Sequence, residues 1–483
     1  MVGQICLFDG DKSFVIDKPI RLIELFAGYG SQHFALEYLN ADFESWKICE
    51  WAVKSIQAYK DAHFKGDNCD YSSKLSKEQV FEYLAHKGIS ANYNEPMTLE
   101  QIKRLGEEKA RVIYNNIIAT NNLVNIQQVR GKDLEIKNVD EYCYIMTYSF
   151  PCQDLSAAGL GKGMEKGSGT RSGMLWEVER ILDEIVSIGG NLPQVLLMEN
   201  VPEVIGTNNI KHFAKWLEKL EQLGYKNKWQ VLNAKDYGVP QNRERCFMVS
   251  ILGDYYYHFP QPQKLQHKLK DVLENNVDEK YYLSESKLQS ISNWKAQQDP
   301  LKDIDKEKTI SPCLTARGAG EEHSGMILIN EDVYNYMEKD NVVGCELRYD
   351  EGIRTFKDNI IGCLRTLDAC GDKHIIEPVV VGGVGDKKSN NGRQYYQQDR
   401  IYADNIALSV TTSFNPYYAI NKNNTYKNLK VRKLTPKESF RLMGVKDKDF
   451  EKIAENQTDS SLYHLAGDSI VVDVLMAMLK EML

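Results

Sequence analysis

The chain has 483 residues, of which 42% are hydrophobic and 27% are charged. This balance is typical of a globular protein with two or three domains, and it excludes the disordered, fibrous and membrane-embedded classes. A formal net charge of −8 argues against a protein that coats nucleic acid, although a local basic cleft is compatible with it.

No apolar run approaches the length that spans a bilayer, so we expect a cytoplasmic protein. The ten cysteines include no C-x-x-C pair, and the nine histidines have no metal-ligand spacing with them. We therefore expect reduced thiols, no disulfide framework and no metal site.

The pattern of residues 21–26, RLIELF, predicts a buried strand that leads into the turn AGYGS and an amphipathic helix. Gly28 and Gly30 permit a tight turn and the close approach of a nucleotide-like ligand, although a plain tight turn has the same pattern. The next predicted strand, residues 45–49, is followed by Glu50, twenty residues after Gly30. A carboxylate at that offset is placed to accept hydrogen bonds from ribose hydroxyls. The alternative is a solvated acid at the start of a helix.

Residues 68–125 are polar and helix-prone, with a dense mixture of charges, and they carry no chemistry that we recognise. We expect them to form a helical insertion at the surface. Beyond them, Asp133 precedes a strand and can face a cofactor at the strand ends, and Asp67 is the alternative residue for this role.

The stretch SFPCQDLSAAG, residues 149–159, follows an apolar run at residues 142–148 that predicts a buried strand. Pro151 and Cys152 therefore fall on the turn at the carboxyl end of that strand, where open α/β sheets place their chemistry. A thiol held there can act as a nucleophile if a neighbour favours its thiolate; the alternative is a buried structural cysteine. The glycine-rich residues 159–173 are either a loop that closes over a ligand or a plain solvent loop.

Residues 194–198 predict an apolar strand followed by Glu199, whose carboxylate can enter the same crevice as Cys152. In a dry pocket the pKa of Glu199 would rise, which suits donation of a proton to a ring nitrogen; the alternative is an acid at a helix start. Arg243 and Arg245 alternate, so they share one face of an extended segment. Two guanidinium groups on one face can polarise a carbonyl, hold a phosphate or favour a thiolate.

The alternation of strands and helices stops near residue 260, and residues 260–430 have the composition of a mostly β lobe. Residues 386–433 hold nine Lys or Arg against three Asp and no Glu, interleaved with tyrosines. This run suits phosphate contact and base stacking, and a solvated basic face is the alternative. The last segment predicts helices that return to the first domain, and Asp468 and Ser469 there are compatible with a simple helix cap.

The set FAGYG, SFPCQ, MENV, QNRER and AGDS, with one long lobe before its last member, resembles the C5-cytosine DNA methyltransferase family. The resemblance covers residues 20–255 and 431–483, and the lobe between matches only in position. It implies an α/β fold, with a Rossmann-like S-adenosylmethionine-dependent methyltransferase domain and a second, mostly β target-recognition domain. The implied domains are residues 1–259 (with the helical insertion at about 68–125), residues 260–430 for target recognition, and residues 431–483 returning to the catalytic domain.

The resemblance implies a role for each matching residue. Cys152 would be the nucleophile, Glu199 would hold the cytosine ring nitrogen and exocyclic amine, and Arg243 and Arg245 would contact the base and the catalytic turn. The residues implied to bind S-adenosyl-L-methionine are Phe26, Gly28, Gly30, Glu50, Trp51, Asp133, Pro151, Asp468 and Ser469. The residues implied to contact the DNA are Gln153, Ser156, Asn200 and Gln241.

Within the cofactor set, Glu50 would hold the ribose, Trp51 would lie by the adenine, and Asp133 would lie near the adenine amino group. Asp468 stands where the family usually has Asn, which would place a carboxylate near the cofactor. Ser31 stands where a third glycine is common.

The implied reaction is methyl transfer to ring carbon 5 of a cytosine that is flipped out of a specific duplex DNA sequence, through a covalent adduct with Cys152. Double-stranded DNA is therefore the expected partner, with a cognate restriction endonuclease as a further one. We expect a monomer on DNA, associated with the nucleoid.

Three other functions share parts of this pattern. Methylation of cytosine in RNA uses the same chemistry, but a large β lobe favours readout of duplex DNA. A DNA-binding protein without catalysis is disfavoured by the intact Cys152, Glu199, Arg243 and Arg245. A dinucleotide oxidoreductase would explain the glycine turn alone.

Overall fold

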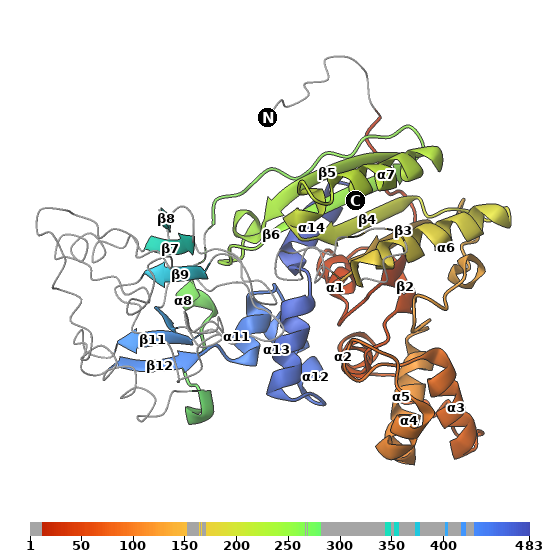
Figure 1. The fold of residues 1–483 in the computed structure, drawn as a ribbon, viewed down its shortest axis with the longest axis horizontal. Helices are drawn as coiled ribbons and strands as arrows, with labels where there is room; N and C mark the ends of the chain where they lie inside the picture. Colours follow the sequence, from red (N-terminus) through yellow and green to blue (C-terminus); the bar gives the residue numbers. More distant parts are fainter. Residues whose placement is uncertain are drawn as a thin grey trace, which may run out of the picture.

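The computed structural model describes residues 12–151, 164, 166, 173–265, 267, 271–281 and 434–483, together with the backbone of residues 171–172 and 269–270 and of six strands between 343 and 433. Within these ranges the chain forms a central sheet covered by helices, a separate group of three helices, and two small sheets (Figure 1).

The central sheet has six strands in the order β2-β1-β3-β4-β6-β5. They are β1 (Ile20–Leu25), β2 (Phe43–Cys49), β3 (Cys143–Tyr148), β4 (Val195–Asn200), β5 (Tyr225–Asn233) and β6 (Glu244–Leu252). The first four run parallel to one another, and β6 is antiparallel to both β4 and β5. The strand order reverses between β1 and β3, and such a reversal is where open α/β sheets bind ligands.

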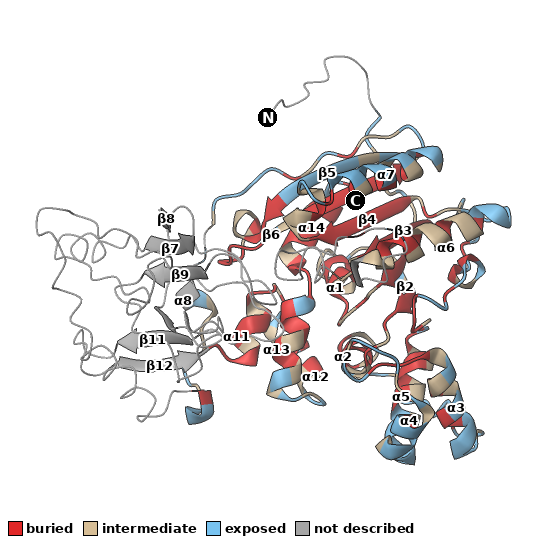
Figure 2. Cartoon of the chain, viewed as in Figure 1, coloured by how far each residue is buried: buried red, intermediate tan, exposed pale blue. Residues whose placement is uncertain are grey.

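The inner strands alternate their side chains between two cores. In β3, Cys143 and Ile145 belong to one core, whereas Tyr144, Met146 and Tyr148 belong to the other. All residues of β3 and β4 are buried, as expected for strands that are covered on both faces (Figure 2).

Helices from distant parts of the chain cover the two faces. Helices α1 (Ser31–Tyr38) and α14 (Val472–Lys480) pack together over the first core, and α6 (Leu175–Ser187) and α7 (Ile210–Gln222) lie over the second. Further helices outside the insertion are α2 (Val53–His63), α8 (Leu269–Val272), α11 (Pro436–Arg441), α12 (Asp447–Ala454) and α13 (Asp459–Asp468). The C-terminal helices therefore complete the core that begins at residue 20.

One apolar stretch corrects the expectation that no run reaches the length of a membrane span. Residues Asp459–Lys480 have that length, and an 18-residue window within them has a mean hydropathy of 1.5, by composition alone. However, 72% of this window is buried inside the protein. The stretch is also interrupted between α13 and α14, where Ser469 adopts an extended conformation.

Residues 68–125 contain three helices, α3 (Lys77–Lys87), α4 (Leu99–Leu105) and α5 (Glu107–Ala119), which stand together at the lower right of Figure 1. They bury a small core of their own that includes Val80, Leu84 and Ile102. Capping boxes start α3 at Ser76 and α4 at Thr98.

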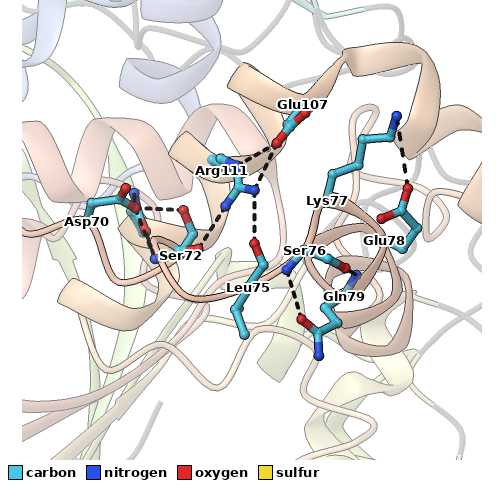
Figure 3. Close-up of polar contacts among 10 residues, drawn as sticks. Asp70, Ser72, Leu75, Ser76, Lys77, Glu78, Gln79, Glu107 and Arg111 are labelled. Atoms are coloured by element: carbon cyan, nitrogen blue, oxygen red, sulfur yellow. Dashed lines mark hydrogen bonds and ion pairs between the residues drawn. The ribbon is translucent and has the colours of Figure 1, made fainter.

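The segment that enters this insertion is fixed by one arginine. Figure 3 shows Arg111, on α5, donating hydrogen bonds to the carbonyl oxygens of Ser72 (2.7 Å) and Leu75 (3.0 Å) while pairing with Glu107. The insertion is thus an ordered, packed unit.

Two three-stranded sheets are described between residues 343 and 433. One has the order β8-β7-β9 and the other β10-β11-β12. The strands are β7 (Val343–Arg348), β8 (Gly352–Phe356), β9 (Asp372–Ile376), β10 (Ile401–Ala403), β11 (Tyr417–Asn421) and β12 (Leu429–Lys433). They agree with the predicted mostly β character. The side chains of the basic, tyrosine-rich run lie outside the described residues.

Candidate functional site

A cavity of about 300 Å³ lies at the carboxyl ends of β1, β3 and β4. Its walls come from the turns after β1, β2 and β3, from the insertion, from the start of β6 and from the end of α13. Eleven of the predicted site residues line it: Phe26, Gly28, Glu50, Trp51, Pro151, Glu199, Asn200, Arg243, Arg245, Asp468 and Ser469. Segments that lie more than 400 residues apart in the sequence therefore meet at one place.

Cys152, Gln153 and Ser156 lie outside the described residues. The chain is described up to Pro151, which lines the cavity directly after the end of β3.

The turn after β1 opens towards the cavity. Phe26 and Gly28 have left-handed backbone conformations, with φ of 62° and 58°. A Cβ atom built on Gly28 would meet no described atom within 4 Å, so the space beside this residue is open. The backbone N–H of Gly28 donates a hydrogen bond to Oε2 of Glu50 (2.9 Å), which ties the β1 turn to the end of β2.

Gly30 lies at a tight packing contact. It precedes α1 with φ of 85°, and it is not among the residues that line the cavity. A Cβ atom there would collide with Nε2 of His63 and would lie 2.7 Å from the ring of Tyr59. This glycine lets α1 pack closely on α2, and it offers no surface to a ligand in the cavity.

Glu50 is a buried carboxylate that faces the cavity. Its Oε1 accepts a hydrogen bond from the N–H of Ala52 (2.8 Å) and its Oε2 accepts the one from Gly28. Its backbone is paired with the side chain of Asn122. Burial raises the pKa of Glu50 to about 7. The side chain is only 9% exposed, so the alternative of a solvated helix-start acid does not apply.

Glu199 and Arg245 form a buried ion pair at the centre of the site. Nε of Arg245 lies 3.1 Å from Oε1 of Glu199, and the side chains are 14% and 7% exposed. The hydroxyl of Ser149 donates to the other oxygen of Glu199. Because β3 and β4 are parallel and in register, the residues that follow them lie side by side. The carboxylate is therefore held from both sides.

Asn200 joins the ends of these two strands. Its Nδ2 donates to the carbonyl oxygen of Phe150 (2.9 Å), and its Oδ1 accepts from the N–H of Val201 (2.9 Å). Asn200 thus positions the backbone just before Pro151.

Arg243 lines the cavity but is engaged with the end of α13. Its Nη2 donates to the carbonyl oxygens of Gly467 (3.0 Å) and Ser469 (2.8 Å). A cation at the carboxyl end of a helix interacts favourably with the helix dipole and satisfies its last carbonyls. Arg243 therefore holds the AGDS segment against the sheet, and its predicted contact to a base stays a prediction.

Two predicted residues lie elsewhere. Oδ2 of Asp133 accepts from the N–H of Arg130 (2.8 Å) at the start of a short 3₁₀ turn, outside the cavity wall. Gln241 is completely buried and donates to the carbonyl oxygen of Leu442 (2.6 Å). Asp133 thus makes a local contact, whereas Gln241 ties its segment to the C-terminal helices.

Sequence reasoning missed part of the wall. Asn125, Ile126 and Gln127, at the end of the insertion, line the cavity where Asp133 was expected. Tyr93 and Asn94 also line it, from a loop that was predicted to carry no chemistry. The signal that was available is the polar turn sequence around Asn92, which favours an irregular loop.

Among the described residues, His33, Glu37 and His63 form a group whose potential metal-binding atoms lie within 4.8 Å of one another. The sequence predicted no metal site. The two imidazole rings stack with their centroids 3.8 Å apart. Burial lowers the pKa of His33 to about 3 and that of His63 well below its usual value, so both rings are neutral side chains in the packing of α1 on α2.

The wall combines surfaces that suit a nucleoside-like ligand. Phe26 and Trp51 offer aromatic surface and Gly28 leaves open space. Glu50 and Asp468 supply carboxylates, and Arg243 and Arg245 supply guanidinium groups. A volume of about 300 Å³ lies within the range of small-molecule sites.

Comparisons with known proteins agree with this geometry. The model of the C-5 cytosine-specific DNA methylase family matches residues 101–483. The chain is 39% identical to the orphan methyltransferase M.SssI of Spiroplasma monobiae over 58% of its own length and 71% of that protein. It is 30% identical to the type II methyltransferase M2.ScrFI of Lactococcus lactis subsp. cremoris, over 96% and 99% of the two chains.

The crystal structure of the S. pombe Dnmt2 methyltransferase superposes with a TM-score of 0.50 at 14% identity, covering 95% of this chain and 97% of that one. This likeness concerns the fold alone. Taken with the family match and the two relatives, it leads to one conclusion: the chain belongs to the C-5 cytosine-specific DNA methyltransferase family and is a DNA (cytosine-5)-methyltransferase.

Proposed function

We propose that this enzyme transfers a methyl group from S-adenosyl-L-methionine to ring carbon 5 of a cytosine flipped out of a specific duplex DNA sequence, through a covalent adduct with Cys152. The observation that carries the proposal is the meeting of the Pro151 turn, the Glu199–Arg245 pair and the β1 glycine turn at one cavity.

S-adenosyl-L-methionine fits the residues present. Glu50 would hold the ribose hydroxyls, Phe26 and Trp51 would contact the adenine, and Pro151, Asp468 and Ser469 would complete the cofactor wall. When bound, this cofactor supplies an electrophilic methyl group. Because Glu50 already accepts two backbone hydrogen bonds, its oxygens are fixed in place before any ligand arrives.

The chemical problem is that cytosine carbon 5 is a weak nucleophile. Addition of the Cys152 thiolate to carbon 6 forms a carbon–sulfur bond and makes carbon 5 enamine-like. Protonation or hydrogen bonding at the ring nitrogen by Glu199 would stabilise the charge that develops. After methylation, removal of the carbon 5 proton and departure of the thiolate restore the aromatic ring and the free enzyme.

The positions of Glu199 and Arg245 support these roles. Arg245 holds one oxygen of the Glu199 carboxylate and Ser149 holds the other, so the carboxyl group cannot rotate freely. A catalytic group that is oriented in advance needs less reorganisation in the transition state. Arg243 would act at a distance, by holding the AGDS segment that forms part of the cofactor wall.

The substrate side of the proposal concerns DNA. The target carbon lies inside the duplex stack, so the base must be extruded at a cost of a few kcal/mol. Residues 260–430 would form the target-recognition domain, and residues 1–259 with 431–483 the catalytic unit. Gln153, Ser156 and Asn200 would contact the DNA substrate. Relatives named type II methyltransferases suggest a partner restriction endonuclease, and we propose a monomer on nucleoid DNA.

The proposal is tested by mapping 5-methylcytosine in DNA from cells that express the protein. We expect 5-methylcytosine in one short sequence motif, and none with Cys152→Ala. Glu199→Gln should reduce the rate by more than about 100-fold while cofactor binding persists. Methyl groups found in RNA and absent from DNA, or unmodified DNA despite folded and cofactor-loaded protein, would contradict the proposal.

A further inference from the structure

The insertion contributes one loop, residues 90–95, to the wall of the cavity. Two backbone hydrogen bonds fix its first residue beside the end of β2: the N–H of Ser90 donates to the carbonyl oxygen of Trp51 (2.7 Å), and the N–H of Val53 donates to the carbonyl oxygen of Ser90 (2.9 Å). The result is a short parallel bridge between Ala52 and Ser90. The loop therefore starts beside Ala52, which lies two residues after Glu50.

The loop is closed on itself by further hydrogen bonds. The hydroxyl of Ser90 donates to the carbonyl oxygen of Glu95 (2.7 Å), and Oδ1 of Asn92 accepts from the N–H groups of Asn94 and Glu95. At its tip Tyr93 has φ of 63°, in the left-handed region that a bulky residue seldom adopts. A residue held in that conformation marks a loop whose shape is determined by its surroundings.

The tip of the loop packs against α13 in the wall of the cavity. The ring of Tyr93 packs edge-on against the imidazole of His464, with centroids 4.0 Å apart. Nε2 of His464 lies 3.5 Å from Oδ2 of Asp468, one helical turn away. All three residues line the cavity, and we call them the Tyr93 wall.

Asp468 brings a carboxylate to this wall. Its side chain is 45% exposed and lines the cavity. Burial raises the pKa of Asp468 and Glu199 raises it further, whereas His464, Arg243 and Arg245 lower it. Glu50 and Asp468 repel one another. Because Asp468 lines the cavity, its carboxylate can act on the charge of a bound ligand by a direct Coulomb effect.

From this arrangement we propose that the Tyr93 wall belongs to the cofactor site and selects the positively charged methyl donor over its neutral thioether product. The inference rests on the proposed function, since it takes S-adenosyl-L-methionine as the donor. Methyl transfer removes the sulfonium charge, so a carboxylate in the wall favours the substrate form and helps the product to leave. The ring of Tyr93 contributes contact area to both forms.

The test is calorimetric titration of the full-length protein with S-adenosyl-L-methionine and, separately, with S-adenosyl-L-homocysteine. Asp468→Asn should weaken binding of the charged donor about fivefold and binding of the neutral product less than about twofold. Tyr93→Ala should weaken both ligands by a similar factor, of about fivefold, and Tyr93→Phe should bind like wild type because it keeps the ring.

Two variants within the insertion serve as matched controls. Tyr83→Ala removes an aromatic ring that packs on Tyr114 away from the cavity, and Glu82→Gln removes an exposed acid of α3. Neither should change either dissociation constant, and thermal unfolding of each variant shows whether it has folded.

The outcomes separate this inference from the proposed function. Wild-type protein that fails to bind S-adenosyl-L-methionine would contradict the proposed function. If wild type binds it and methylates DNA, but Asp468→Asn affects both ligands equally or Tyr93→Ala behaves like Tyr83→Ala, the role of the Tyr93 wall is refuted and the methyltransferase activity is untouched.

Discussion

The two glycines of the β1 turn provide a matched pair of substitutions with opposite expected effects. Gly30→Ala would put a methyl group against Nε2 of His63 and the ring of Tyr59, at a φ of 85°. A left-handed conformation costs an alanine about 1–2 kcal/mol, and overpacking a core adds about 1–3 kcal/mol. Gly28→Ala has the same backbone cost at φ of 58°, but its methyl group points into open space beside the cavity.

Gly30→Ala should therefore lose about 2–5 kcal/mol of stability, and Gly28→Ala about 1–2 kcal/mol. For a domain of this size, 1 kcal/mol corresponds to about 2–4 °C in Tm, so a loss of about 3 kcal/mol lowers Tm by about 6–12 °C. Gly28→Ala should lose more cofactor affinity than Gly30→Ala, because only the methyl group of Gly28→Ala occupies the ligand's space.

The assay is a thermal unfolding scan of both variants, followed by titration with S-adenosyl-L-methionine at a temperature where each is folded. We expect the larger drop in Tm with near wild-type affinity for Gly30→Ala. For Gly28→Ala we expect a smaller drop in Tm with at least about tenfold weaker binding, an estimate for steric exclusion in a tight site. Equal losses of affinity in the two variants would refute the distinction between a packing glycine and a ligand-facing glycine.

Three further predictions concern the polar groups of the site. Arg245→Met leaves the buried Glu199 carboxylate without its cation, so this variant should lose about 3–5 kcal/mol of folding stability. The double variant Arg245→Met with Glu199→Gln should be more stable in thermal unfolding than Arg245→Met alone. Equal or lower stability of the double variant would refute this. Burial raises the pKa of Glu50 to about 7, so the stability that protonated Glu50 contributes at low pH is lost as pH rises through 7. Affinity for the cationic cofactor should rise between about pH 6 and 8 as Glu50 ionises. Glu50→Gln should lose most of that rise, and an unchanged pH profile in this variant would speak against the role of Glu50. Asn200→Ala cuts the tie to Phe150 and should lower kcat with little effect on cofactor affinity, and a purely cofactor-binding defect would contradict that role.

Much of the fold follows from local patterns in the sequence. The apolar runs at residues 21–26, 45–49, 142–148 and 194–198 correspond closely to β1, β2, β3 and β4. Since the carboxyl ends of parallel strands meet at one edge of a sheet, the residues that follow these runs were expected to converge, and the described ones do so.

The sequence is least informative where a residue's place depends on distant pairings. Asp133 precedes a strand, but a bridge between Ile48 and Asn122 brings the segment before it to the cavity wall. Gln241 is implied by its place in the QNRER segment, and its hydrogen-bond partner is the carbonyl oxygen of Leu442, 201 residues away. Tyr93 reaches the cavity through the bridge between Ala52 and Ser90, and no local pattern predicts that contact.

The central claim is that Cys152 attacks the base while Glu199 and Arg245 surround it, and covalent trapping tests it most directly. The protein is incubated with S-adenosyl-L-methionine and a duplex in which 5-fluorocytosine replaces the target base, and the denatured products are analysed by mass spectrometry. We predict a cofactor-dependent protein–DNA adduct on the peptide that contains Cys152, absent in Cys152→Ala. An adduct on another residue, or none from a protein that methylates the normal duplex, would contradict the account.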